Sequence, residues 1–313
     1  MPSLAIVILN YNRADLLADC LESIYAAPCR TSLDIWVVDN ASSDGSAEMV
    51  RTRFPQARLI VSPINGGYSY GNNLALRAMV NETQARATPF TIEPSALSTP
   101  DYVMLLNNDT IVPTGALDGL VDYLESHPEV GAVGPKLLLP DGSLDLACRR
   151  SFPTPKVAFY RMLGLARIFP RSPRFGRYNL TYLDPDIETE VDALVGACML
   201  IRGHMLSEVG LLDEQFFMYG EDLDWAYRIK QYGWRIVYYP RVIIHHYKRA
   251  ASTRRAIPSI RAFYEAMRIF HRKYYAATTP APLNALIELG ITLKELLALG
   301  RNYLLPPAAR RVG

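Results

Sequence analysis

Four short apolar segments recur through the first 112 residues, separated by stretches in which apolar side chains have helical spacing. A short apolar run bounded by turn residues is typical of a buried strand, and apolar positions three and four residues apart are typical of a helix. Strands that alternate with helices in this way form a mostly parallel, doubly wound sheet. The expected strands are residues 4–9, 34–38, 57–62 and 102–106.

The alternation resumes later in the chain. Residues 192–202, 235–239 and 241–246 are strand-like, and helices are expected near 203–209 and through about 232. Residues 82–100 have no periodicity and are expected to form an inserted surface loop. We therefore predict an α/β domain over residues 1–254, with halves of about 1–112 and 113–254 and helices on both faces of the sheet. A helical extension is expected over 255–313.

The net charge of +2 conceals two basic segments. Residues 149–177 carry eight Lys or Arg and no acid, and residues 248–273 carry eight with Glu265 as the single acid. Such segments attract anionic membrane surfaces, phosphorylated substrates or nucleic acid, and they are equally typical of solvated faces.

The cysteines Cys20, Cys29, Cys148 and Cys198 lack CxxC spacing, which argues against a zinc site and against a disulfide framework. A reducing cytoplasm fits this pattern. The N-terminal LAIVIL is too short for the apolar region of a signal peptide, and charged residues interrupt the most apolar C-terminal stretch. No transmembrane helix is expected.

Polar residues follow several of the predicted strands, at the edge where doubly wound sheets bind ligands. Asp39 and Asn40 are suited to a nucleotide, and equally to capping the next helix. A glycine-rich loop lets backbone approach a ligand closely, but is weak evidence alone. The candidates at these strand ends are Asn10, Asp39, Asn40, Asn65, Gly66, Gly67, Asn72, Asn107 and Asn108.

Asp109 ends an apolar strand, where a buried charge needs a partner. A divalent cation is one such partner, and the start of a helix near Pro113 is the other. His245 and His246 end another strand, and only one of them can face a given site because side chains alternate.

The segment FFMYGEDLDW, residues 216–225, places Glu221, Asp222 and Asp224 directly behind aromatic residues. Acids are favoured at a helix N-terminus, and a general base in a partly dry pocket is the alternative explanation. The chain contains no GxGxxG, GxxxxGK[ST] or GxSxG motif. Hydride transfer, nucleotide hydrolysis and serine-hydrolase chemistry are therefore disfavoured.

Together these segments resemble the family 2 glycosyltransferases, inverting enzymes with the GT-A fold. The matching segments run in the family's order over residues 4–246, and the pattern looks most like the rhamnosyltransferase-like branch that builds bacterial surface polysaccharides. They are VILNYNR, VVDNASSDGS, NGGYSYGNN, LLNNDT, DALVGACMLIR, the segment from GLLDEQFFMYGEDLDW to YYP, and VIIHH.

The resemblance implies a role for each matching residue. Asp39 would hold a uracil or thymine nucleoside, with Asn10 and the Asn65–Asn73 loop around it. Asp109 and His246 would bind Mg²⁺ or Mn²⁺, although Asn107 replaces the first acid of the family's metal motif. Asp222 would be the catalytic base, with Glu221 shaping the acceptor pocket or sustaining the proton affinity of its neighbour. Asp224 is expected to be a simple first-turn acid.

The implied activity is transfer of a sugar from a nucleoside-diphosphate donor, dTDP-rhamnose or a UDP-sugar, to a glycan or polyprenyl-diphosphate-linked acceptor. The enzyme is expected to be cytoplasmic and peripheral on the inner membrane face, with an anionic membrane surface as a partner and without nucleic acid. The alternatives are a sugar-1-phosphate nucleotidyltransferase and a non-catalytic sugar-nucleotide-binding protein.

Overall fold

The computed structural model describes residues 1–80, 99–248 and 256–304. Its centre is a nine-stranded sheet. Strands β1, β2, β3 and β4 pair in parallel, as do β6 and β9, whereas β8 is antiparallel to both of its neighbours. The sheet order is β3 (Arg58–Val61), β2 (Ser32–Asp39), β1 (Ser3–Asn10), β4 (Tyr102–Asn107), β8 (Cys198–Arg202), β6 (Val130–Leu138), β9 (Arg235–His246) and β5 (Thr110–Ile111), with β7 (Thr189–Glu190) on β9.

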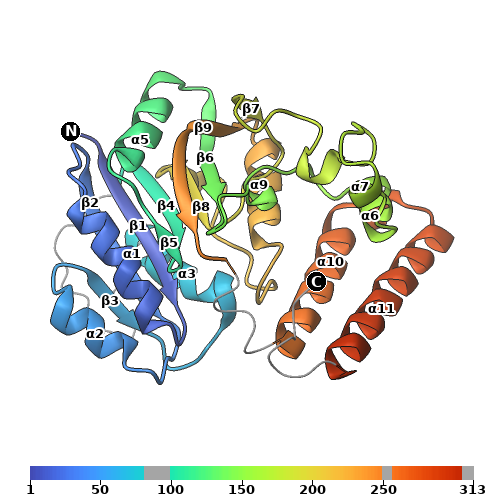
Figure 1. Cartoon of the computed structure of the whole chain (residues 1–313), viewed down its shortest axis with the longest axis horizontal. Helices are drawn as coiled ribbons and strands as arrows, with labels where there is room; N and C mark the ends of the chain where they lie inside the picture. Colours follow the sequence, from blue (N-terminus) through green and yellow to red (C-terminus); the bar gives the residue numbers. More distant parts are fainter. Residues whose placement is uncertain (81–98, 249–255, 305–313) are drawn as a thin grey trace.

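Helices flank this sheet and complete the expected α/β architecture (Figure 1). The apolar face of α1 is fully buried because Leu17, Leu21 and Ile24 recur at helical spacing. The interiors of the central strands β1 and β4 are continuously apolar, since both sheet faces are covered. The flanking helices are α1 (Ala14–Ala26), α2 (Ser46–Arg53), α3 (Gly67–Val80), α5 (Ala116–Ser126), α8 (Met205–Glu208) and α9 (Glu221–Gln231).

The strand expected over 192–202 is shorter than predicted, because β8 begins only at Cys198. The residues before Cys198 form backbone hydrogen bonds with other segments of the chain instead. The N–H of Arg150 donates to the carbonyl of Ala193 at 3.0 Å, and the N–H of Gly196 donates to the Asp222 carboxylate at 3.2 Å. An apolar run thus forms a loop against the acids of α9. The surface loop expected over 82–100 falls almost entirely outside the described residues.

Two helical units lie apart from the sheet. The first contains η1 (Leu146–Cys148), α6 (Pro155–Met162), α7 (Leu165–Ile168) and η2 (Arg177–Asn179). The second is a hairpin of α10 (Ala256–Tyr274) and α11 (Ala281–Leu304), joined through η4 (Ala276–Thr278), and α6 and α7 lie beside it (Figure 1). Within the described ranges, no helix combines the length and apolar character needed to cross a bilayer.

Candidate active site

Polar residues at the carboxyl ends of three neighbouring strands meet at one edge of the sheet. Asn10 ends β1 and lies in register with Asp39 at the end of β2, while Leu9 lies in register with Asn107 at the end of β4. Ligands of doubly wound sheets bind beyond this edge. These strand ends therefore form the first part of the candidate site.

A short chain of amides holds the carboxylate of Asp39. The side chain of Asn10 donates to Asp39 Oδ2 at 3.4 Å and accepts from the amide of Asn108 at 2.6 Å. The N–H of Ser42 donates to Asp39 Oδ1 at 2.9 Å. An ionised carboxylate can accept about four hydrogen bonds. Asp39 thus keeps acceptor capacity for a ligand that presents N–H or O–H groups.

The glycine-rich loop before α3 is tied to the same edge. Asn40 donates to Asn65 Oδ1 at 3.0 Å, and the N–H of Gly66 donates to Asn40 Oδ1 at 3.2 Å. Gly67 has φ +90°, and a Cβ there would lie 2.2 Å from the carbonyl oxygen of Phe217. Close packing against the segment before α9 therefore explains this glycine. Asn72 bonds within its own helix, donating to the carbonyl of Tyr68 at 2.9 Å.

Asp109 and His246 lie together beside this edge, because Thr110 of β5 pairs with His246 of β9. His246 Nε2 is 3.2 Å from Asp109 Oδ1, yet this buried oxygen has no hydrogen-bond partner of acceptable geometry. A carboxylate oxygen and an imidazole nitrogen that face each other in this way fit a shared divalent cation. His245 is exposed at the neighbouring position.

His246 is oriented from its other side by Asp145, whose Oδ2 is 2.9 Å from Nδ1. Burial alone would lower the pKa of His246, but the carboxylates of Asp109 and Asp145 outweigh it and raise the pKa to about 9. Lys248 also contacts Asp145 at 2.7 Å. A carboxylate on the second ring nitrogen is the usual support of a metal-binding histidine.

The described residues contain no group of three or more His, Cys, Asp or Glu side chains placed to hold a metal ion. Asp109 and His246 would therefore supply only two protein ligands to a cation at this position. Hard divalent cations take most of their ligands from oxygen, including substrate phosphates and water. A cation held here would depend on a phosphate-bearing substrate for its remaining ligands.

The three acids of FFMYGEDLDW lie in the first turn of α9, and all three are buried. Asp222 is held on one oxygen by Arg150, whose Nη2 donates to Oδ2 at 2.7 Å, and by the N–H of Gly196 at 3.2 Å. Among the described residues, its other oxygen accepts only the N–H of Leu223, at 2.8 Å. The pair with Arg150 fixes the carboxylate and leaves acceptor capacity on Oδ1.

Glu221 lies in a different environment. Its Oε2 is buried and lacks a hydrogen-bond partner among the described residues. Burial, together with the negative charge of Asp222, raises the pKa of Glu221 to about 8. A buried acid with a raised pKa is a frequent property of catalytic sites.

Tyr68 links the acids of α9 to the Asp109 edge. Its hydroxyl donates to the carbonyl of Gly196 at 2.8 Å, and Gly196 also contacts Asp222. Burial raises the pKa of Tyr68, and the negative charges of Glu221, Asp222 and Asp109 raise it further. Carboxylates from both halves of the chain therefore surround one side chain.

Residues 2–265 match the family described as "Glycosyltransferase like family 2". The chain belongs to this family. The resemblance predicted from the sequence is thus confirmed, and the match covers all the strands of the sheet.

Named relatives of this family 2 glycosyltransferase are sugar transferases. It is 29% identical over 308 residues to the N-acetylglucosaminyl-diphospho-decaprenol L-rhamnosyltransferase of Mycobacterium tuberculosis. The aligned region covers 98% of this chain and 94% of the relative. It is 28% identical over 250 residues to the rhamnosyltransferase WbbL of Escherichia coli, covering 77% of this chain and 82% of the relative.

A solved structure shares the architecture of this glycosyltransferase. The mannosyltransferase PcManGT of Pyrobaculum calidifontis, in complex with GDP-Man and Mn²⁺, superposes with a TM-score of 0.54 at 19% identity. The superposition covers 98% of this chain and 73% of that one. The common architecture is the GT-A fold, as expected from the sequence.

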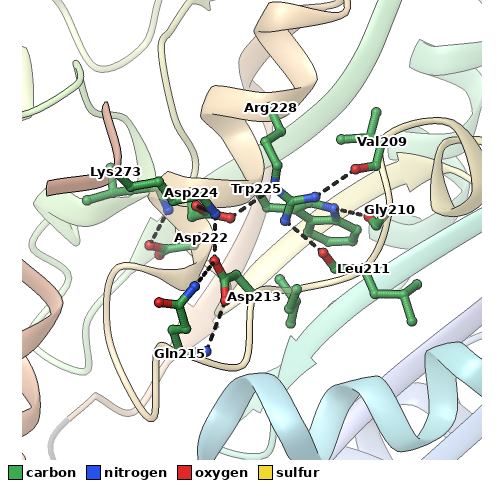
Figure 2. Close-up of polar contacts among 12 residues, drawn as sticks. Val209, Gly210, Leu211, Asp213, Gln215, Asp222, Asp224, Trp225, Arg228 and Lys273 are labelled. Carbon is green, nitrogen blue, oxygen red and sulfur yellow. Dashed lines mark hydrogen bonds and ion pairs between the residues drawn. The ribbon is translucent and has the colours of Figure 1, made fainter. Parts of the chain in front are cut away.

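Asp224, the third acid of α9 in this glycosyltransferase, is fully buried, and cationic and hydroxyl side chains hold its carboxylate (Figure 2). Arg228 Nε lies 2.9 Å from its Oδ2, while Lys273 Nζ and the Tyr274 hydroxyl each lie 2.6 Å from Oδ1. Lys273 also contacts Asp213 at 2.6 Å. Asp224 lies in the first turn of α9, as expected, and in addition it joins α10 to α9.

Asp145 and Arg150 were not predicted from the sequence. Asp145 lies in a turn with no motif of its own, and Arg150 was counted within a basic segment. The sequence indicates Arg150 only indirectly, because three acids next to buried aromatic side chains require a cation from another segment of the chain. Arg149 is buried as well and donates to the carbonyls of Asp184 and Leu183 at 2.8 and 2.7 Å. The start of the 149–177 segment is therefore internal.

Proposed function

We propose that this glycosyltransferase is an inverting, divalent-metal-dependent enzyme. It would move a sugar, rhamnose from dTDP-rhamnose or a sugar from a UDP donor, to a hydroxyl of a glycan or polyprenyl-diphosphate-linked acceptor. The buried, unbonded oxygen of Asp109 facing His246 is the observation that carries the proposal. The name of the Mycobacterium tuberculosis relative supports a rhamnose donor and a lipid-diphosphate acceptor.

Donor binding would use the edge built from β1, β2 and β4. Asp39 accepts hydrogen bonds from the nucleoside, while Asn10 and Asn108 keep its carboxylate in place. Asn40, Asn65, Gly66 and Gly67 form the wall beside it, and Asn72 acts from within α3. Asn107 carries no charge, so Asp109 is the single acid of its triplet that would face the diphosphate.

Asp109 and His246 would hold Mg²⁺ or Mn²⁺ against the donor diphosphate. When bound, the cation would neutralise the negative charge that develops on the leaving nucleoside diphosphate. Asp145 keeps His246 Nε2 directed at Asp109 through its contact with Nδ1. The neutral side chain of Asn107 makes this site less negative than one with two acids.

Asp222 would act as the general base. In an inverting displacement, the acceptor oxygen attacks the anomeric carbon as the bond to the diphosphate breaks, and a base removes the proton of that hydroxyl. Asp222 Oδ1 receives this proton in the proposal, while Arg150 and the Gly196 N–H hold Oδ2. Glu221, with a pKa of about 8, is largely protonated at neutral pH and would lie beside the acceptor.

The test is turnover of a donor panel containing dTDP-rhamnose, UDP-sugars and GDP-sugars, with and without Mn²⁺ and EDTA, using a lipid-diphosphate sugar acceptor. We expect one nucleoside class to be used, EDTA to abolish turnover, and NMR to show inverted anomeric configuration in the product. Binding of a donor without any transfer would instead favour the non-catalytic alternative. Absence of both binding and turnover would contradict the proposal.

A further inference from the structure

The outer face of α11 is apolar and has no partner among the described residues. Five leucines on this face each leave between 51 and 69% of their surface exposed, an unusual amount for side chains that favour burial. Their spacing of three and four residues places them on one side of the helix. They are Leu286, Leu289, Leu293, Leu296 and Leu297.

The opposite face of α11 packs on α10 and carries the acids of the helix. Ile291 is buried there, and Glu288 and Glu295 both pair with Arg268 of α10, at 3.5 and 2.6 Å. These acids therefore lie away from the five leucines. The charged residues that border the apolar face are cations, Lys294 and Arg301, and both are exposed.

The first basic segment extends this face. Met162 of α6 lies against α11, because a Cβ on Gly290 would be 3.3 Å from the Met162 Cε. Gly290 is one helical turn from Leu286 and Leu293, and Met162 is next to the exposed Leu163. Phe159 is also exposed one turn earlier on α6, and Ile168 and Phe169 are exposed at α7. The apolar surface thus continues from α11 onto α6.

Exposed cations are interleaved with these apolar side chains. Lys156, Arg167 and Arg171 are exposed and form no ion pair with a carboxylate in the described part of the chain. By contrast, Arg268, Arg272 and Lys273 of the second basic segment all pair with acids. Unpaired positive charge therefore borders the apolar surface of α6, α7 and α11.

We propose that this surface, called here the α6–α11 face, docks onto an anionic lipid bilayer. An apolar helix face bordered by Lys and Arg and free of acids complements the boundary between acyl chains and anionic headgroups. This inference extends the proposed function and rests on it for the lipid-linked acceptor. Binding to vesicles, however, can be measured without any sugar transfer. The alternative occupant, a second copy of the chain, lacks charge complementarity because the rim is basic on both copies.

The test is co-sedimentation of the full chain with vesicles of phosphatidylglycerol and phosphatidylcholine, and with phosphatidylcholine alone, at low and high salt. We expect binding to the anionic vesicles that weakens with salt. Leu289→Glu/Leu293→Glu should reduce the partition coefficient at least about tenfold, the loss of two buried leucines. Ile187→Glu, an exposed apolar position outside the face, is the matched control and should bind normally.

Charge is tested separately. Arg167→Gln/Arg171→Gln should weaken binding by about fivefold per cation, whereas Arg51→Gln/Arg53→Gln on α2, distant from α11 in Figure 1, should have little effect. Circular dichroism checks that each variant folds.

Wild-type indifference to lipid charge, or equal binding by the leucine variant, would overturn the proposal. So would sedimentation of a lipid-free dimer that the leucine variant dissociates. Each result stands whether or not a sugar is transferred.

Discussion

The ion pair between Arg150 and Asp222 is the most consequential single contact of the site. Both side chains are almost fully buried, and their closest atoms are 2.7 Å apart. Removing one partner of a buried pair leaves an uncompensated charge, whereas removing both does not. Arg150 should therefore contribute to folding and to the orientation of Asp222 together.

Arg150→Gln should lower the free energy of unfolding by roughly 3–5 kcal/mol, because Asp222 then stays buried without its cation. Misorientation of the base should also lower kcat, by roughly 10²-fold. Urea unfolding and steady-state transfer assays measure the two effects. The double variant Arg150→Gln/Asp222→Asn should recover part of the lost stability. Unfolding of Arg150→Gln at the wild-type midpoint would show that the pair has no such role.

Glu221→Gln should stabilise the protein at neutral and alkaline pH. The folded pKa of Glu221 is about 8, above its ordinary value of 4.5, so between these values the folded state holds a proton that the unfolded state has released. Stability is therefore lost as the pH rises through this window. Thermal unfolding from pH 4 to pH 9 should show a shallower decline for the variant than for wild type.

The same substitution tests whether Asp222 or Glu221 is the general base. With Asp222 as the base, Glu221→Gln keeps substantial transfer at pH 7, and wild-type activity falls above about pH 8 as a second buried charge appears beside Asp222. If Glu221 were the base, activity would instead rise through pH 8 and the variant would be inactive. The pH profile of kcat/KM for both proteins decides between these outcomes.

At the scale of elements, Lys273 connects α10 to α9 through Asp224 and Asp213 (Figure 2). Lys273→Met should lower the free energy of unfolding by about 1–2 kcal/mol, less than for a fully buried pair because Lys273 is about one-third exposed. It should also speed hydrogen exchange in α10. Arg272→Met, which breaks a surface pair with Glu265, is the control and should have little effect. Equal effects of the two variants would contradict this assignment.

Helices and strands could be predicted from the sequence where a local pattern of apolar side chains was enough to define them. The strands from β1 to β4 were found because each is a short apolar run bounded by turn residues. The 192–202 segment was overextended for the same reason: an apolar run does not reveal that its backbone bonds with Arg150 and Asp222. Asp39 and Asp109 were singled out by their strand ends and His246 by the family resemblance, and their roles stay predictions. Arg150 was missed because it lies 72 positions from Asp222, beyond any local pattern.

At the scale of the whole molecule, the sheet brings together side chains from distant parts of the chain. Asp39 and Asp109 come from the first half, and Asp222 and His246 from the second, with Tyr68 between the groups of acids. The α10–α11 hairpin attaches to α9 at one side and presents the α6–α11 face at the other (Figure 1). The proposed base and the proposed membrane surface are thereby carried on connected elements.

The most direct measurement of the central claim is transfer by Asp222→Asn under saturating donor, acceptor and metal, with donor affinity measured in parallel by calorimetry. We predict an unchanged donor Kd and a fall in kcat of about 10²–10⁴-fold, the usual contribution of a general base. Near-normal turnover with intact donor binding would contradict the account.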